Sequence, residues 1–303
     1  MSGHARDPNR LTGSSGGPSV AGGWRPRRPP IRQVPVLLLA AGLVVSCASA
    51  GPYAVSWPAD RTTAVTRGDW IQSWRQAVSS IAEVMQGPLG LPPVEFTVHF
   101  FHNRRAFEQG LVDEGYPPAF ARRTAAVLDG IGGPGRVLLN EAAVARASWS
   151  DRVALLAHEL VHVLQYELGG GHRGTSEQWL REGFAEWVAE RVLEHLRMAG
   201  AGTELRRAKR VVALAGPTRF PPLSAMVTFD QWVDLRTTRP TLPTYEYAFV
   251  AADFLVDRHG LDAVLDYFRR FATSGDTDGN FATAFGEPRR QFEEALVAHL
   301  TRP

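Results

Sequence analysis

The chain has 303 residues, 44% of them hydrophobic, with 33 Lys and Arg against 31 Asp and Glu and a single cysteine. That length allows one large domain with a sizeable core and does not require two. Six basic residues and one acidic residue precede position 48, so the rest of the chain carries 27 basic and 30 acidic residues. This mildly acidic remainder gives no support to nucleic-acid binding, and we expect no nucleic-acid partner.

The N-terminal region has the composition of an export segment. Residues 1–33 are rich in Arg, Gly, Pro and Ser, which predicts a disordered basic segment. Residues 34–50 contain an apolar run of the length of a secretion-signal core, too short for a membrane span. The run ends in Val44-Val45-Ser46-Cys47, which resembles a bacterial lipobox. We therefore expect a lipid on Cys47 and anchoring to the outer face of a bacterial cytoplasmic membrane, and Ala48-Ser49-Ala50 leaves ordinary cleavage and secretion as the alternative.

The segment 51–65 is predicted to be a tether, and the domain is expected to span 66–303. Its first part, 66–148, should be an α+β subdomain with a small sheet. The pattern of apolar residues predicts a helix over 69–85, a strand over 93–101 and helices over 106–114 and 118–128. The glycines of 130–135 then predict a loop, and 136–140 should form a short edge strand. The second part, 149–303, should be mainly helical, so the fold class is α+β.

One helix in the second part carries an unusual group of polar residues. Ser150 and Asp151 are the expected cap and first-turn acid, and Gly169-Gly170-Gly171 should end the helix. His158 and His162 are four positions apart, which places both imidazoles on one helix face because the helix turns about 100° per residue. Two such imidazoles can hold one zinc ion, with Glu159 beside it as a general base.

Zinc needs a further protein ligand, and the next predicted helix supplies a candidate. Thr175-Ser-Glu-Gln178 reads as a capping box that opens this helix. Glu182 lies twenty positions after His162, and Glu186 lies one turn further on the same face. Such paired carboxylates can also be a solvated helix face, but aromatic and aliphatic neighbours surround them here.

The two motifs, His-Glu-Leu-Val-His and Trp-Leu-Arg-Glu-Gly-Phe-Ala-Glu-Trp, resemble those of the gluzincin metallopeptidases, especially the peptidase MA-like group. The resemblance implies a zincin-like fold with the zinc site in the cleft between the two subdomains. It also implies that His158, His162 and Glu182 bind zinc and that Glu159 activates water. Glu186 then corresponds to an acid that hydrogen-bonds the first histidine.

Further helices are predicted over 203–214, 244–260, 261–271 and 288–300, with a short one after 229. In gluzincins a tyrosine hydroxyl usually stabilises the oxyanion, and the resemblance favours Tyr245, with Tyr247 as the alternate. A tyrosine that only packs at a helix start remains the alternative for either residue.

These observations predict a zinc-dependent peptidase that holds one zinc ion and acts on a peptide or protein substrate. A non-catalytic zinc-bearing lipoprotein that serves as a surface scaffold is the alternative, although zinc binding alone does not require Glu159. The Gly-x-Met-Glu-Asn motif that aminopeptidases use is absent from the sequence.

Overall fold

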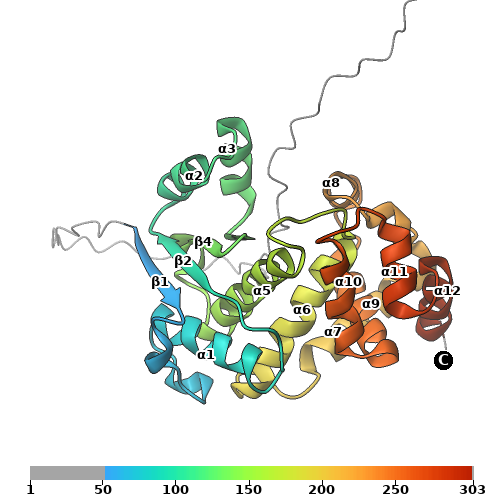
Figure 1. Cartoon of the computed structure of the whole chain (residues 1–303), viewed down its shortest axis with the longest axis horizontal. Helices are drawn as coiled ribbons and strands as arrows, with labels where there is room; N and C mark the ends of the chain where they lie inside the picture. Colours follow the sequence, from blue (N-terminus) through green and yellow to red (C-terminus); the bar gives the residue numbers. More distant parts are fainter. Residues whose placement is uncertain (1–51, 302–303) are drawn as a thin grey trace, which may run out of the picture.

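The computed structural model describes residues 52–301, so Cys47 and the predicted segments 1–33 and 34–50 lie outside the described residues. The described chain is an α+β protein with a small mixed sheet of four strands and twelve α-helices, and the predicted α+β class is confirmed (Figure 1). No helix of the described range is long and apolar enough to cross a membrane.

The sheet has the strand order β1-β2-β4-β3. The strands are β1 (Tyr53–Trp57), β2 (Phe96–Phe101), β3 (Gly130–Gly133) and β4 (Arg136–Asn140). β1 is antiparallel to β2, β2 is parallel to β4, and β4 is antiparallel to β3. Phe96, Val98 and Phe100 alternate into the core along β2, which is why this segment forms a strand with one buried face.

Three predictions for this region are wrong. The segment 51–65 is not simply a tether, because Val55 and Trp57 are buried and β1 pairs with β2 along its whole length. The glycine-rich stretch 130–135 is not a loop, since its first four residues form β3. As a result 136–140 is an interior strand, and β3 takes the edge position predicted for it.

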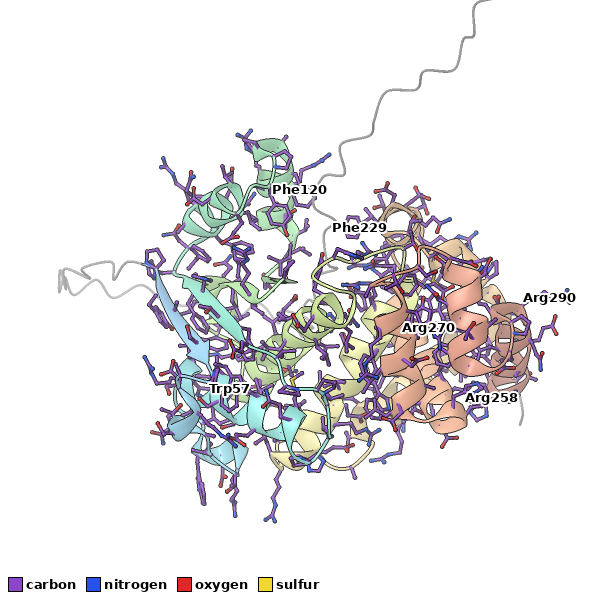
Figure 2. The ribbon with its side chains drawn as sticks, viewed as in Figure 1. Trp57, Phe120, Phe229, Arg258, Arg270 and Arg290 are labelled. Carbon is purple, nitrogen blue, oxygen red and sulfur yellow. The ribbon has the colours of Figure 1, made fainter. Side chains whose placement is uncertain are left out.

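Helices cover the sheet and form a small separate cluster above it. They are α1 (Trp74–Gln86), α2 (Arg104–Asp113), α3 (Pro118–Val127) and the single turn α4 (Glu141–Val144). α1 begins later than predicted because Ser73 caps it, its side chain accepting from the N–H of Gln76. Phe120 of α3 and Phe229 from the C-terminal half both pack against the apolar cluster around Phe107 (Figure 2).

Two long helices run through the centre of the molecule, α5 (Trp149–Leu168) and α6 (Gln178–His195) (Figure 1). The cap of α5 is Ser148 and not Ser150, and Ser148 forms a reciprocal capping box with Asp151. Glycine ends α5 as predicted. The capping box predicted at Thr175 is wrong, because the hydroxyl of Thr175 donates to the Gly275 carbonyl at 2.8 Å instead.

The remaining helices form the C-terminal half. They are α7 (Thr203–Ala215), α8 (Phe229–Thr238), α9 (Thr244–His259), α10 (Leu261–Arg270), α11 (Thr277–Phe285) and α12 (Arg289–Leu300). α11 was not predicted from the sequence. Asp276 caps this helix, and its residues Phe281 and Phe285 are buried in the core. One continuous apolar core extends from Val55 in β1 to Leu296 in α12, so the two predicted subdomains share a core.

The close packing of α6 on α9 depends on Gly183. A Cβ atom at this position would lie 2.1 Å from the carbonyl oxygen of Ala248, and this oxygen belongs to the backbone of α9. Any side chain at position 183 would therefore force the two helices apart.

We expect Gly183→Ala to destabilise the protein by about 1–3 kcal/mol, because overpacking a close helix contact shifts the backbone. The measurement is urea unfolding of wild type and variant. Gly275→Ala is the matched control, since no atom lies within 4 Å of its Cβ position. Equal unfolding midpoints for Gly183→Ala and wild type would contradict the close-packing argument.

Candidate metal centre

α5 and α6 bring three potential metal ligands together in the interior. The Nε2 atoms of His158 and His162 lie 3.2 Å apart. The two carboxylate oxygens of Glu182 lie 3.4 Å from Nε2 of His158 and 3.7 Å from Nε2 of His162. All three side chains are fully buried, and their ligand atoms lie within 4.8 Å of one another. The structure thus assembles the three residues expected to bind metal, and this buried group could hold one ion.

The protonation states show how strongly these groups interact. Burial disfavours the charged form of His158, but the carboxylates of Glu182 and Glu186 outweigh it and raise the pKa of His158 above its usual range. Burial lowers the pKa of His162 to about 3, so this imidazole is neutral. Burial also disfavours the Glu182 carboxylate, yet the two histidines hold its pKa below the ordinary value. These pKa directions favour a charged pair of His158 and Glu182 beside a neutral His162.

A second layer of side chains orients these three residues. Oε1 of Glu186 lies 3.3 Å from Nδ1 of His158, which places the acid beside the first histidine without a hydrogen bond to it. Oε1 of Gln165 lies 2.9 Å from Nδ1 of His162, and the Gln165 amide donates to the carbonyl of Arg181 at 3.0 Å. The amide of Gln178 donates to Oε1 of Glu182 at 2.5 Å. Hydrogen bonds from Gln165 and Gln178 therefore hold His162 and Glu182, and Nε2 of His162 is directed toward the centre of the group.

Glu159 lies beside the cluster and is held by β3. Its Oε2 accepts from the N–H of Gly132 at 2.7 Å, and its Oε1 has no hydrogen-bond partner among the described residues. Burial raises the pKa of Glu159 to about 8, and the charge of Glu182 adds to this effect. A cation in the cluster would lower that pKa, because a nearby positive charge favours the carboxylate.

β3 can approach α5 this closely only because position 132 is glycine. A Cβ atom there would lie 2.3 Å from the carbonyl oxygen of Glu159 and 2.9 Å from Cβ of His162. The edge strand therefore lies directly against the turn of α5 that carries His158, Glu159 and His162. This contact could not be anticipated from the sequence, where Gly132 reads as part of a loop.

The two candidate tyrosines differ in where α9 places them. The ring of Tyr245 lies 6.4 Å from the ring of His158, measured between centroids, and it packs edge-on against Trp232. The Arg236 guanidinium lies 4.8 Å from the centroid of the Tyr245 ring. Burial and the charges of Glu182 and Glu186 raise the pKa of Tyr245 well above its usual value, so its hydroxyl is protonated at neutral pH.

Tyr247 has its own partner away from the cluster. Its ring stacks on Phe220 with the centroids 4.2 Å apart, and burial raises its pKa with a smaller contribution from Glu293. Side chains two positions apart on an α-helix point in directions that differ by about 200°. Tyr245 and Tyr247 therefore cannot both face the metal cluster.

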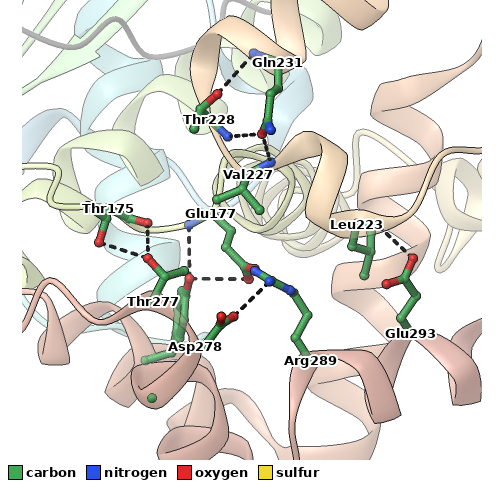
Figure 3. A network of polar contacts seen from close by, with 12 residues as sticks. Thr175, Glu177, Leu223, Val227, Thr228, Gln231, Thr277, Asp278, Arg289 and Glu293 are labelled. Atoms are coloured by element: carbon green, nitrogen blue, oxygen red, sulfur yellow. Dashed lines mark hydrogen bonds and ion pairs between the residues drawn. The ribbon is translucent and has the colours of Figure 1, made fainter.

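The start of α6 is fixed to the C-terminal helices by a buried polar network (Figure 3). Glu177 pairs with Arg289 of α12, and Arg289 also contacts Asp278 of α11 at 2.8 Å. The backbone N–H of Glu177 donates to the Tyr267 hydroxyl at 3.0 Å. Because Gln178 and Glu182 follow on the next turn, this network sets the position of the third ligand.

A cavity of about 600 Å³ adjoins the cluster on the side of Glu186 and Tyr245. Its walls come from the start of α5, from α6 and α7, and from α8 and α9. The lining includes charged residues such as Arg207 and Arg236 and the apolar residues Ala189, Leu193 and Phe249. Glu186 and Tyr245, which both lie near His158, are part of this lining.

Sequence reasoning missed several residues of the site. Gln165 lies three positions after His162, and Gln178 lies four before Glu182, so helical spacing could have indicated both. Gly132 and Arg236 come from distant elements, and no local pattern points to them.

Comparison of the chain with protein-family models, with curated proteins and with solved structures gives no match.

We expect the purified protein to bind one divalent metal ion per chain. Replacing His158, His162 or Glu182 by Ala removes a ligand and should abolish stoichiometric binding, while Glu186→Ala should weaken affinity by about 10–100-fold. The measurement is metal content by mass spectrometry together with competition against a chelator. His172→Ala, which alters an exposed histidine, is the control. Full occupancy in Glu182→Ala would exclude Glu182 as the third ligand.

Proposed function

We propose that this protein is a zinc-dependent peptidase that hydrolyses peptide bonds in peptide or protein substrates. The observation that carries the proposal is the buried convergence of His158, His162 and Glu182, with an unpartnered carboxylate oxygen of Glu159 beside them. A purely structural metal site would need the three ligands but not this additional buried acid. An isolated buried carboxylate is costly, which favours a functional reason for it.

The donor set fits zinc. Two imidazole nitrogens and one carboxylate oxygen are ligands that zinc accepts in catalytic sites, where a fourth position stays open. The Gln165 side-chain oxygen occupies Nδ1 of His162, and the Glu186 carboxylate lies 3.3 Å from Nδ1 of His158, so both histidines can present Nε2 to an ion. When bound, zinc would supply a Lewis acid that acidifies water and polarises a carbonyl group.

The acid–base chemistry falls to Glu159. Its Oε2 is fixed by the N–H of Gly132, which leaves Oε1 to accept a proton from the attacking water. The same carboxyl group would then deliver that proton to the leaving amine. The position of Gly132 on the edge strand therefore links substrate binding to the orientation of the base.

Substrate binding is proposed along β3 and in the cavity beside Glu186 and Tyr245. Zincin enzymes place an edge strand above the metal, where the substrate backbone pairs with it by strand addition, and β3 is the end strand that lies against α5. The cavity beside Glu186 and Tyr245 has a volume of about 600 Å³, sufficient for side chains of a bound peptide. This arrangement supports a zincin-like reading of the fold.

Glu159→Gln separates catalysis from metal binding. The amide retains the size of the side chain and contributes no ligand bond, so zinc content and melting temperature should match wild type. Loss of general-base catalysis should lower the rate of hydrolysis by about 10²–10⁴-fold. Both proteins are assayed on a denatured-protein or peptide-library substrate, with zinc measured in the same samples. Equal rates would rule out the mechanism, and an absence of cleavage by either form would favour the scaffold alternative.

Tyr245 is proposed to donate its hydroxyl to the developing oxyanion. Tyr245→Phe should keep zinc and slow turnover by about 10²-fold, comparable to loss of one oxyanion donor. Tyr247→Phe is the matched control, because its ring stacks on Phe220 away from the cluster. If Tyr247→Phe slows turnover as much as Tyr245→Phe does, the assignment of Tyr245 is wrong.

We also propose that the protein is exported and anchored through a lipid on Cys47, on the basis of the lipobox-like sequence. The mature chain should begin at Cys47 and sediment with membranes, and Cys47→Ala should be released or left unprocessed. Mass spectrometry of the mature N-terminus provides the measurement. An unmodified terminus at Gly51 would indicate ordinary secretion instead.

A further inference from the structure

Arg181 is a fully buried arginine whose charge is not matched by an ion pair within the described range. It lies on α6 directly before Glu182, and its side chain is 0% exposed. Nη1 donates to the Ser176 hydroxyl at 3.2 Å. No acceptor in residues 52–301 lies within hydrogen-bonding distance of Nε or Nη2. Buried charges are ordinarily paired because the loss of hydration is costly, so these two donors require an explanation.

The neighbouring carboxylates of Glu177 and Glu182 contact other side chains and form no ion pair with Arg181. Glu182 faces the two imidazoles of the metal cluster, and Glu177 pairs with Arg289 (Figure 3). Arg173, which is also buried, adds a second positive charge that acts on Arg181. The guanidinium carbon of Arg181 lies 5.2 Å from the centre of the Tyr166 ring, which stabilises the cation but does not neutralise it. Nε and Nη2 of Arg181 are therefore the two donors of this guanidinium group that have no acceptor among the described residues.

The unmatched atoms form one particular edge of the guanidinium group. The N–H bonds of Nε and Nη2 run parallel, and their spacing matches the two oxygens of a carboxylate. Arg258 (labelled in Figure 2) uses this edge to donate to Oε1 and Oε2 of Glu287, at 2.8 and 3.1 Å. Arg67 does the same with Asp69, at 3.0 and 2.8 Å. Arg258 and Arg67 thus show that this edge binds a carboxylate when its donors are satisfied.

We propose that the Nε–Nη2 edge of Arg181 binds one exogenous carboxylate. The shared chemistry is a planar group with two oxygens, and it can come from a small free ion such as formate or from the C-terminal carboxylate of a bound peptide. The site uses none of the zinc ligands and does not require Glu159. It therefore stands or falls independently of the proposed peptidase activity.

The first experiment measures the melting temperature of the full chain while sodium formate replaces sodium chloride at constant ionic strength. Formate at roughly ten times its dissociation constant should raise the midpoint of wild type by about 3 °C. Arg181→Met, which replaces the unmatched charge with an apolar side chain, should lose this response. Arg270→Met should keep it, because the corresponding edge of Arg270 already holds Asp266, with Nε 2.8 Å from Oδ2. An equal response in wild type and Arg181→Met would overturn the proposal.

A second experiment does not depend on a variant that folds. In crystals of wild type grown with formate, planar density should lie at about 2.7–2.9 Å from Nε and Nη2 of Arg181. Water alone at that edge would overturn the proposal. To identify the source, the same melting assay compares short peptides that end in a free carboxylate with their amides. Stabilisation by the free acid alone points to a peptide terminus, and stabilisation by formate but by neither peptide points to a small ion.

Discussion

The rest of the structure depends on one buried contact between α5 and α6. Nε2 of His158 and Nε2 of His162 lie 3.2 Å apart there, and the Glu182 carboxylate is buried beside them. Burial disfavours charge in this group, but Glu182 and Glu186 raise the pKa of His158, while burial lowers the pKa of His162. A divalent ion between the three side chains would satisfy all of them at once. Burial of these three polar side chains costs free energy when no ion is present. The same burial would make the group a strong binding site for an ion.

The surrounding fold serves to hold this group in place. Gly183 allows α6 to lie against α9, and Gly132 allows β3 to lie against α5, so two glycines from different elements set the distances around the site. The pair of Glu177 with Arg289 fixes the first turn of α6, which carries Glu182 one turn later. The polar contacts from Gln165, Gln178 and Glu186 then leave the ligands little freedom to rotate. Helices, rather than loops, thus supply the candidate metal ligands and Glu159.

Helical periodicity and ligand spacing were sufficient to predict the grouping of His158, His162 and Glu182, because each pair is fixed within one helix or between two consecutive helices. The α+β class and most helices also followed from local patterns. The register of the sheet did not, because β1 and β3 are short, and their pairing depends on contacts with strands far along the chain. Gly130–Gly133 reads as a turn until β4 pairs with it, and Tyr245 could be distinguished from Tyr247 only once α9 had a direction in space.

The most direct test of the account is anomalous diffraction at the zinc absorption edge, from crystals of the protein purified without chelators. The account predicts one peak per chain, at about 2.0–2.2 Å from Nε2 of His158, from Nε2 of His162 and from a carboxylate oxygen of Glu182. A peak bound by other residues, or empty density between these three side chains in zinc-supplemented crystals, would contradict it.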